Sequence, residues 1–189
     1  MTLPSATVRP VRRADLAAVA GIYEHYVLHS VATFDETPRP AEEWEAKLDE
    51  LAVRGLPFLV AEEAGQVLGF AYAGPWRPKP AYRHTVEDTV YLAPDATGRG
   101  LGGALLAEVI DACARAGFRR MIAVIADTGS DASAALHRRF GFTDAGRLTA
   151  VGHKHGRWID TLLLQRSLSD GSATGSTTRP AGPDGTPED

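Results

Sequence analysis

The chain has 189 residues, a length that suits one domain with a hydrophobic core of its own. Hydrophobic residues make up 44% and charged residues 23%, and the formal net charge of −4 gives no support to a nucleic-acid-binding face. The single cysteine excludes an internal disulfide and a cysteine-based zinc cluster, and no signal peptide or run of about 18 apolar residues stands out. We therefore expect a soluble, cytoplasmic protein that binds neither nucleic acid nor membrane.

Hydrophobic spacing predicts a mixed α/β domain over residues 1–167. Its first half is predicted to contain a strand at 7–11, helices from Asp15 and over 40–53, and strands at 58–63, 66–74 and 85–92. Its second half is predicted to contain helices over 101–116 and 132–140, and strands at 119–126, 142–151 and 157–166. The strand at 119–126 is almost continuously apolar, which is typical of an interior strand. Residues 168–189 are rich in Gly, Ser, Thr, Pro and Asp and are predicted to be a disordered tail.

The glycine-rich stretch ATGRGLGGALL (96–106) poses the question of which nucleotide the chain binds. A Walker-type phosphate loop needs Gly-Lys-Ser/Thr, which is absent here. The glycines also fit G-x-G-x-x-G, the fingerprint of a Rossmann oxidoreductase that binds NAD, and Asp127 would be its ribose-binding acid. Against this interpretation, residues 93–97 separate the glycines from the preceding strand, and only about 60 residues follow Asp127.

A third interpretation is a loop of backbone amides that holds a pyrophosphate at a helix N-terminus. Its frame, R/Q-x-x-G-x-G/A, is filled by residues 97–102 except at the first position, where Thr97 stands. Exposed N–H groups and the positive end of a helix suit an anion, and glycine lets phosphates approach the backbone. Arg99 could add a direct charge. A plain glycine-rich turn that opens an amphipathic helix is the alternative.

Together with the order of elements, this frame is similar to that of the GCN5-related N-acetyltransferases (GNAT), and within them the chain resembles the phosphinothricin and methionine sulfoximine/sulfone acetyltransferases. The resemblance rests on TFDETPRPAEEW (33–44), YAGPWRPKPAY (72–82), RHTVEDTVYLAPD (83–95), GRGLG (98–102), ALHRRFGF (135–142) and VGHKHGRWID (151–160). It implies a GNAT fold with a mixed central sheet of about six to seven strands and about four helices. It also implies acetyl-CoA as cosubstrate, no metal, a small amino-acid-like amine acceptor and a homodimer.

Two residues are candidates for the chemistry of acetyl transfer. An amine that is largely protonated at pH 7 needs a base, and by resemblance Glu87 occupies the position of the family's catalytic glutamate. Strand alternation places Glu87 on one face and its neighbour Asp88 on the other. His137 stands where many GNAT members carry a tyrosine that protonates the departing thiolate, and phosphinothricin-type members carry histidine there. A structural role for each is the alternative.

The remaining site residues follow from the resemblance, apart from the basic cluster Arg77, Lys79 and Arg83. This cluster is a candidate because it lies in a proline-containing loop just before the strand with Glu87, and a solvated basic loop is the alternative. The candidate cofactor-binding residues are Tyr91, Leu92, Thr97, Gly98, Arg99, Gly100, Leu101, Gly102, Gly103, Ser130 and Ser133. The candidate substrate-binding residues are Phe34, Tyr72, Arg77, Lys79, Tyr82, Arg83 and Thr89, whose arginines suit a bidentate hold on a carboxylate or phosphinate. Thr97 and Ser130 depart from the family's usual residues, which puts the acceptor's identity in doubt more than the fold or reaction.

Other candidate features have simpler explanations. Cys113 falls on the apolar stripe of its helix and is expected to be a buried structural thiol. The pairs His25/His29 and His153/His155 have metal-binding spacings but no obvious third ligand, so no metal site is expected. A non-catalytic acyl-CoA sensor is the binding-module alternative to an enzyme.

Overall fold

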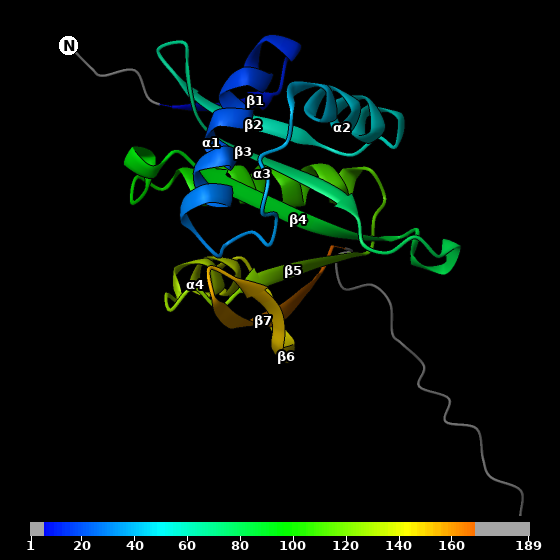
Figure 1. Cartoon of the computed structure of the whole chain (residues 1–189). Coiled ribbons are helices and arrows are strands. Elements are labelled where there is room, and N and C mark those ends of the chain that lie inside the picture. Colours follow the sequence, from blue (N-terminus) through cyan, green and yellow to red (C-terminus); the bar gives the residue numbers. More distant parts are fainter. Residues whose placement is uncertain (1–5, 169–189) are drawn as a thin grey trace, which may run out of the picture.

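The computed structural model describes residues 6–168 and contains a seven-stranded mixed sheet of order β1-β2-β3-β4-β5-β7-β6 (Figure 1). The strands are β1 (Thr7–Pro10), β2 (Phe58–Glu63), β3 (Gln66–Pro75), β4 (Thr85–Leu92), β5 (Arg120–Ala126), β6 (Thr143–Lys154) and β7 (Arg157–Ser167). The helices are α1 (Leu16–His29), α2 (Ala41–Val53), α3 (Leu101–Arg115) and α4 (Ala132–Arg139). The expected fold class, with six to seven strands and four helices, is thus confirmed.

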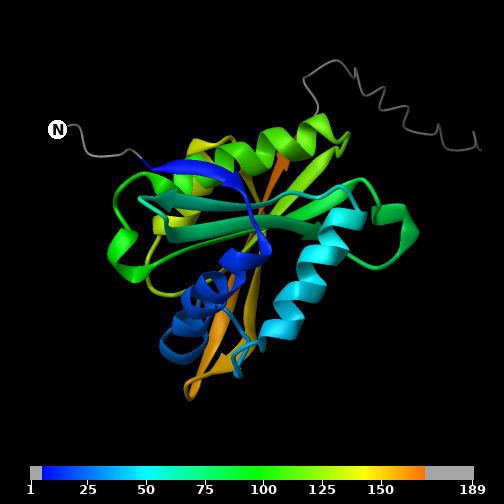
Figure 2. The same cartoon turned by 90° about the horizontal axis from the view of Figure 1, so that it is seen from above.

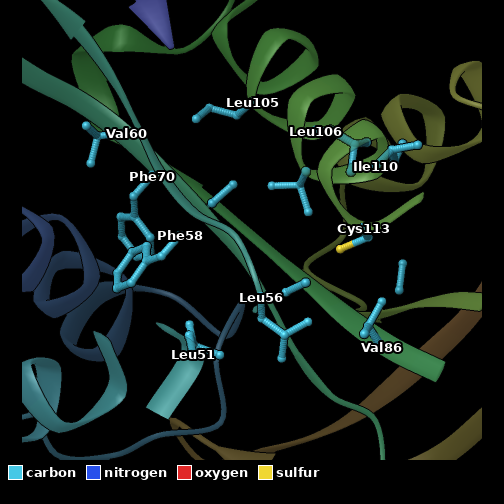
Figure 3. Packing of buried hydrophobic residues seen from close by; sticks show 14 of the residues in the cluster. Leu51, Leu56, Phe58, Val60, Phe70, Val86, Leu105, Leu106, Ile110 and Cys113 are labelled. Carbon is cyan, nitrogen blue, oxygen red and sulfur yellow. The ribbon is translucent and has the colours of Figure 1, made fainter. Parts of the chain in front are cut away.

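The helices form a layer on each face of the sheet. Figure 2 shows α1 and α2 on one face and α3 on the other. Figure 3 shows the two halves of the core that result. Phe58 and Phe70 of the sheet lie on the same side as Leu51 of α2, while Leu105, Leu106 and Ile110 of α3 pack against the opposite face. The core is continuous because the apolar stripe of each helix covers strands that are apolar on both faces.

The sheet contains one parallel pair, β4 with β5, and that pair is short. The two strands are in register only from Thr85–Glu87 against Arg120–Ile122. Beyond this point β4 stays paired with β3 as far as Leu92, and β5 stays paired with β7 as far as Ala126. The facing edges of residues 88–92 and 123–126 therefore separate, and the sheet opens in its middle.

The predicted elements are all present, and their limits differ by a few residues. The largest difference is in β6, which runs to Lys154 instead of ending at Val151 and contains irregular pairing between Leu148 and Gly152. Short 3-10 turns at Pro80–Tyr82 and Pro94–Ala96 were not predicted. The predicted domain ended at residue 167, but Leu168 is buried in the core and belongs to the fold. The rest of the predicted tail lies outside the described residues.

Candidate active site

A cleft of about 870 Å³ occupies the opening between β4 and β5. Because it passes through the sheet, residues from both faces of β4 line it, including the neighbours Glu87 and Asp88. Its wall contains the candidate residues Phe34, Tyr72, Glu87, Thr89, Tyr91, Leu92, Thr97, Gly98, Gly100, Gly102, Gly103, Ser130, Ser133 and His137. Most of the residues proposed from the sequence are therefore gathered around one cavity.

The glycine-rich loop forms one end of the cleft. Gly98 and Gly100 have φ values of 74° and 81°, in the left-handed region that favours glycine, and Gly100 caps the N-terminus of α3. The glycines of the first helical turn, Gly102 and Gly103, pack closely on α4: a Cβ at either position would lie 3.4–3.5 Å from side-chain atoms of Leu136 or Phe140. The loop thus presents backbone rather than side chains to the cleft, as an anion site requires.

Two candidate cofactor residues lie outside the cleft wall. Arg99 turns away and forms an ion pair with Glu63, with both carboxylate oxygens 2.8 Å from Nη2. Leu101 is buried in a small cluster with Leu68 and Ala96 beneath the loop. In this structure, both residues therefore hold the loop in place from behind and do not face the cavity.

Glu87 has the environment of a base. It lines the cleft and is partly buried, and its carboxylate makes no hydrogen bond to another described residue. Burial and, to a smaller extent, the negative charge of Asp88 raise the pKa of Glu87 to about 7, against an opposing effect of Arg77. A carboxylate with this pKa exchanges protons readily near neutral pH.

His137 and Asp88 form a buried pair on the opposite face of β4. The His137 Nε2 lies 2.9 Å from Asp88 Oδ2, and Nδ1 lies 2.7 Å from the Ser133 carbonyl oxygen. Strand alternation correctly predicted that Asp88 points away from Glu87. The sequence did not predict the contact of Asp88 with His137, which lies 49 residues further along the chain. Burial lowers the pKa of His137, but the hydrogen bond and charge of Asp88 outweigh this effect and raise it above its ordinary value.

A polar network that the sequence did not predict lies on the α1 side of the cleft. Asp35 Oδ2 accepts hydrogen bonds from the Tyr23 hydroxyl at 2.7 Å and from Arg39 Nε at 2.9 Å. The Arg39 guanidinium also lies over the rings of Tyr23 and Trp44, at 5.1 and 5.6 Å from their centroids. Its terminal nitrogens have no hydrogen-bond partner in the described part of the chain, so Arg39 can offer them to an anionic ligand. Residues 35–39 are not helical, so the i, i+4 spacing of Asp35 and Arg39 carried no signal for this contact.

The predicted basic cluster lies mostly away from the cavity. Lys79, Tyr82 and Arg83 are exposed around the 3-10 turn at Pro80–Tyr82 and do not line the cleft. Arg77 stacks over Trp76, with its Cζ 4.8 Å from a ring centroid, and its charge reaches Glu87. Among the four candidate residues of this loop, only Arg77 interacts with Glu87, through its charge.

The loop between α1 and α2 is held over the cleft by a buried lysine. Lys154 Nζ donates hydrogen bonds to the carbonyl oxygens of Thr33, at 2.8 Å, and Tyr26, at 3.5 Å. The adjacent Phe34 ring occupies the space beside Gly152, where any Cβ would clash with it. The sequence indicated the KHG stretch as a motif but not this function of its lysine.

The remaining candidates from the sequence are a cysteine and two histidine pairs. Cys113 is fully buried, and burial followed by the charge of Asp88 raises its pKa to about 12, as expected of a structural thiol. No group of three or more His, Cys, Asp or Glu side chains within residues 6–168 is arranged to hold a metal ion. No helix in this range is long and apolar enough to cross a membrane.

Comparison with known proteins agrees with the geometry of the cleft. Residues 19–142 match the model of the Acetyltransferase (GNAT) family. The chain belongs to the GNAT family. Its single short parallel pair also rules out the Rossmann interpretation of the glycine loop, which requires an open parallel sheet.

Its relatives include enzymes of two named specificities. The chain is 48% identical to a phosphinothricin N-acetyltransferase of Alcaligenes faecalis over 90% of this chain and 86% of that protein. It is 41% identical to an L-methionine sulfoximine/L-methionine sulfone acetyltransferase of Pseudomonas aeruginosa, over 87% and 95%. A crystal structure of a phosphinothricin acetyltransferase from Sinorhizobium meliloti in complex with AcCoA superposes with a TM-score of 0.85 at 46% identity, covering 90% of this chain and 92% of that one.

Proposed function

We propose that this GNAT enzyme transfers an acetyl group from acetyl-CoA to the amino group of a small amino-acid-like acceptor, with phosphinothricin as the first candidate and methionine sulfoximine or sulfone as the second. The observation that carries the proposal is the cleft through the sheet, which has a backbone-lined glycine loop at one end and Glu87 in its wall. The named activities of the relatives support the same reaction class.

The cleft residues fit acetyl-CoA. The loop over residues 97–103 would hold the pyrophosphate through backbone N–H groups and the N-terminal end of α3. The separated edges of β4 and β5 leave backbone groups free to bond the extended pantetheine arm as an added strand would. Acetyl-CoA supplies the activated acetyl group, and the protein residues supply orientation and proton transfer.

Glu87 would act as the general base. With its pKa near 7 it accepts a proton from the acceptor amine, directly or through water, so that the amine becomes nucleophilic. A backbone N–H near Tyr91 and Leu92 would polarise the thioester carbonyl. His137 is the candidate acid for the departing thiolate, and its Nε2 must leave Asp88 before it can reach the sulfur. No covalent enzyme intermediate is needed.

The acceptor would bind on the α1 side of the cleft. Tyr72, Thr89 and Phe34 line this part of the cavity, and the free nitrogens of Arg39 supply a positive charge for a carboxylate or phosphinate. Arg77, near Glu87, is a second source of positive charge. An amino acid with an additional anionic or strongly polar group could pair with both arginines.

The proposal includes a homodimer and a cytoplasmic location, as the family resemblance implies. Support for the dimer comes from β6, which ends the sheet with one unpaired edge, and from exposed apolar side chains on the outer strands. Leu148, Val151 and Trp158 are exposed by 45%, 52% and 69%. An unpaired strand edge and exposed apolar side chains on the same strands are features of protein–protein contacts.

Thiol release from acetyl-CoA tests the activity, with phosphinothricin, methionine sulfoximine, methionine sulfone and common amino acids as acceptors. We expect release with one of the first three, and a loss of about 10²- to 10⁴-fold in kcat for Glu87→Gln because the general base is removed. Glu108→Gln, an exposed carboxylate on α3, is the control and should leave kcat unchanged. Binding of acetyl-CoA without thiol release from any acceptor would support the sensor, and absence of binding would overturn the assignment of the loop.

A further inference from the structure

Within the described residues, two arginines line the cleft, and they lie at different ends of it. Arg139 is the last residue of α4, which packs against the glycine loop, so it belongs to the cofactor end. Arg39 lies on the α1 side, near enough to Tyr72 to interact with it electrostatically. Burial lowers the pKa of Arg39, but two tyrosines and a carboxylate beside it outweigh this effect and raise it. The guanidinium therefore stays charged in a partly buried wall, where it suits an anionic ligand.

The guanidinium of Arg39 is held in one orientation while its terminal nitrogens stay free. Its Nε donates to Asp35 Oδ2 at 2.9 Å, and its Cζ lies over the rings of Tyr23 and Trp44. Neither Nη1 nor Nη2 has a hydrogen-bond partner in the described part of the chain. A guanidinium fixed in this way loses little freedom when it binds, because its planar fork of donors is already oriented.

An arginine with a purely structural role in this fold uses its terminal nitrogens. Arg9 places Nη1 and Nη2 on the two carboxylate oxygens of Asp15, at 2.7 and 2.9 Å. Asp35 could receive such a pair of bonds, but its Oδ2 takes only the Nε of Arg39 and is shared with the Tyr23 hydroxyl at 2.7 Å. The fork of Arg39 therefore remains available to a ligand, and an anion with two oxygens matches its geometry.

Arg39 is separated from Glu87 by one row of side chains. Glu87 and Thr89 share one face of β4, and Tyr72 of β3 lies directly opposite Thr89 on that face. Arg77 acts on Glu87 through its charge, whereas Arg39 interacts with Tyr72, one row further along the sheet. An acceptor whose amine meets Glu87 would keep its α-carboxylate on the side of Arg77 and extend its side chain toward Arg39.

We propose that Arg39 is a specificity-determining residue that binds the acid group at the end of the acceptor's side chain, so that the site favours an α-amino acid with an anionic side-chain end over a neutral one of the same shape. The inference rests on the proposed function and names the class of acceptor within it. Phosphinothricin and methionine sulfone form a matched pair, because a negatively charged methylphosphinate in the first replaces a neutral methylsulfonyl group in the second. Both groups present two oxygens, so at the arginine they differ in charge and hardly in shape.

The ratio of kcat/KM for phosphinothricin to kcat/KM for methionine sulfone tests the proposal. The wild type should favour phosphinothricin, and Arg39→Gln should lower the ratio about 10- to 100-fold, because hydrogen bonds between two charged groups contribute more than those to a neutral sulfone. The loss should appear mainly in KM for phosphinothricin, with KM for acetyl-CoA nearly unchanged. Arg54→Gln is the matched control: this exposed arginine just after α2 pairs with Glu50 and should leave the ratio unaltered.

A second variant and the wild type itself separate this inference from the fold and from the proposed function. Arg39→Lys keeps the positive charge without the planar fork, so it should recover part of the ratio that Arg39→Gln loses. Equal slowing of both acceptors in a folded Arg39→Gln protein would show that Arg39 only supports its loop, and would overturn the proposal. A wild type that prefers methionine sulfone or another neutral amino acid would overturn it as well. Failure of the wild type to release thiol with any acceptor would instead contradict the proposed function.

Discussion

At the scale of single residues, the proposed chemistry depends on the position of Glu87. The side chain is held in a partly buried wall beside Asp88, and these two causes, in that order, raise its pKa to about 7. Arg77 works in the opposite direction from the neighbouring loop. Small changes in local charge should therefore move the working pH of the enzyme.

The acid limb of activity should follow this carboxylate. A general base acts only when deprotonated, so kcat/KM should decrease as the pH falls through about 7 and Glu87 gains its proton. Arg77→Gln removes the charge that lowers the pKa of Glu87, so the limb should shift to higher pH. Arg115→Gln, an exposed residue at the end of α3, should not move it. A limb near pH 4 to 5 in the wild type, measured by thiol release, would show that Glu87 is not the titrating group.

The residues of this site differ in how far the sequence could place them. Strand alternation put Glu87 and Asp88 on opposite faces because that pattern is fixed within one strand. The partner of Asp88 could not be predicted, since it depends on how α4 packs against β4. The same holds for Lys154, whose hydrogen bonds reach back to Tyr26 and Thr33. Only the folded chain brings such distant groups together.

At the scale of elements, β4 has two different edges. It pairs with β3 from Val86 to Leu92, but with β5 only over its first three residues. Where β4 is not paired with β5, its close packing against β3 holds it in place. Gly69 of β3 lies directly opposite Leu92, and a Cβ built there would lie 2.5 Å from Leu92 Cδ2 and 2.9 Å from the Tyr91 carbonyl oxygen.

Gly69→Ala should therefore destabilise the protein. The added methyl group meets backbone as well as side chain, so β3 and β4 must shift, which costs about 1–3 kcal/mol. For a domain of this size the melting temperature should fall by roughly 2–12 °C. Gly74→Ala is the matched control in the same strand, because a Cβ at Gly74 would have no atom of another residue within 4 Å beyond its chain neighbours. Equal melting temperatures for the two variants would show that β4 is not held by this contact.

The elements themselves followed from local patterns, but their arrangement did not. Helix α3 and strand β5 could be predicted from apolar spacing and from an apolar run. The separation of β4 from β5 leaves no trace in either strand's pattern, because it arises from which neighbour each strand keeps. It is visible only in the register, in which β4 and β5 pair over three residues. The extension of β6 to Lys154 was missed because Gly152 and the bulge interrupt the alternation.

At the scale of the whole molecule, the opening divides the sheet into two parts. Strands β1 to β4 are covered by helices on both faces, whereas β5, β7 and β6 lie beyond the cleft and have less cover (Figure 1). The exposed side chains on β6 and β7 belong to this second part, which has an unpaired edge at β6. A second copy of the chain would cover this surface and would also support the cleft wall that β5 provides.

The mass in solution should therefore be about twice that of one chain, as light scattering after gel filtration would measure. Trp158 is the most exposed of the apolar side chains on the outer strands, so Trp158→Glu places a charge where the contact is expected and should shift the protein toward the monomer. Val53→Glu is the matched control: Val53 is exposed by 90%, but on α2, away from the outer strands. The control should keep the larger mass. A wild type that runs as a monomer at micromolar concentration, or a Val53→Glu variant that dissociates as Trp158→Glu does, would show that the outer strands do not form the contact.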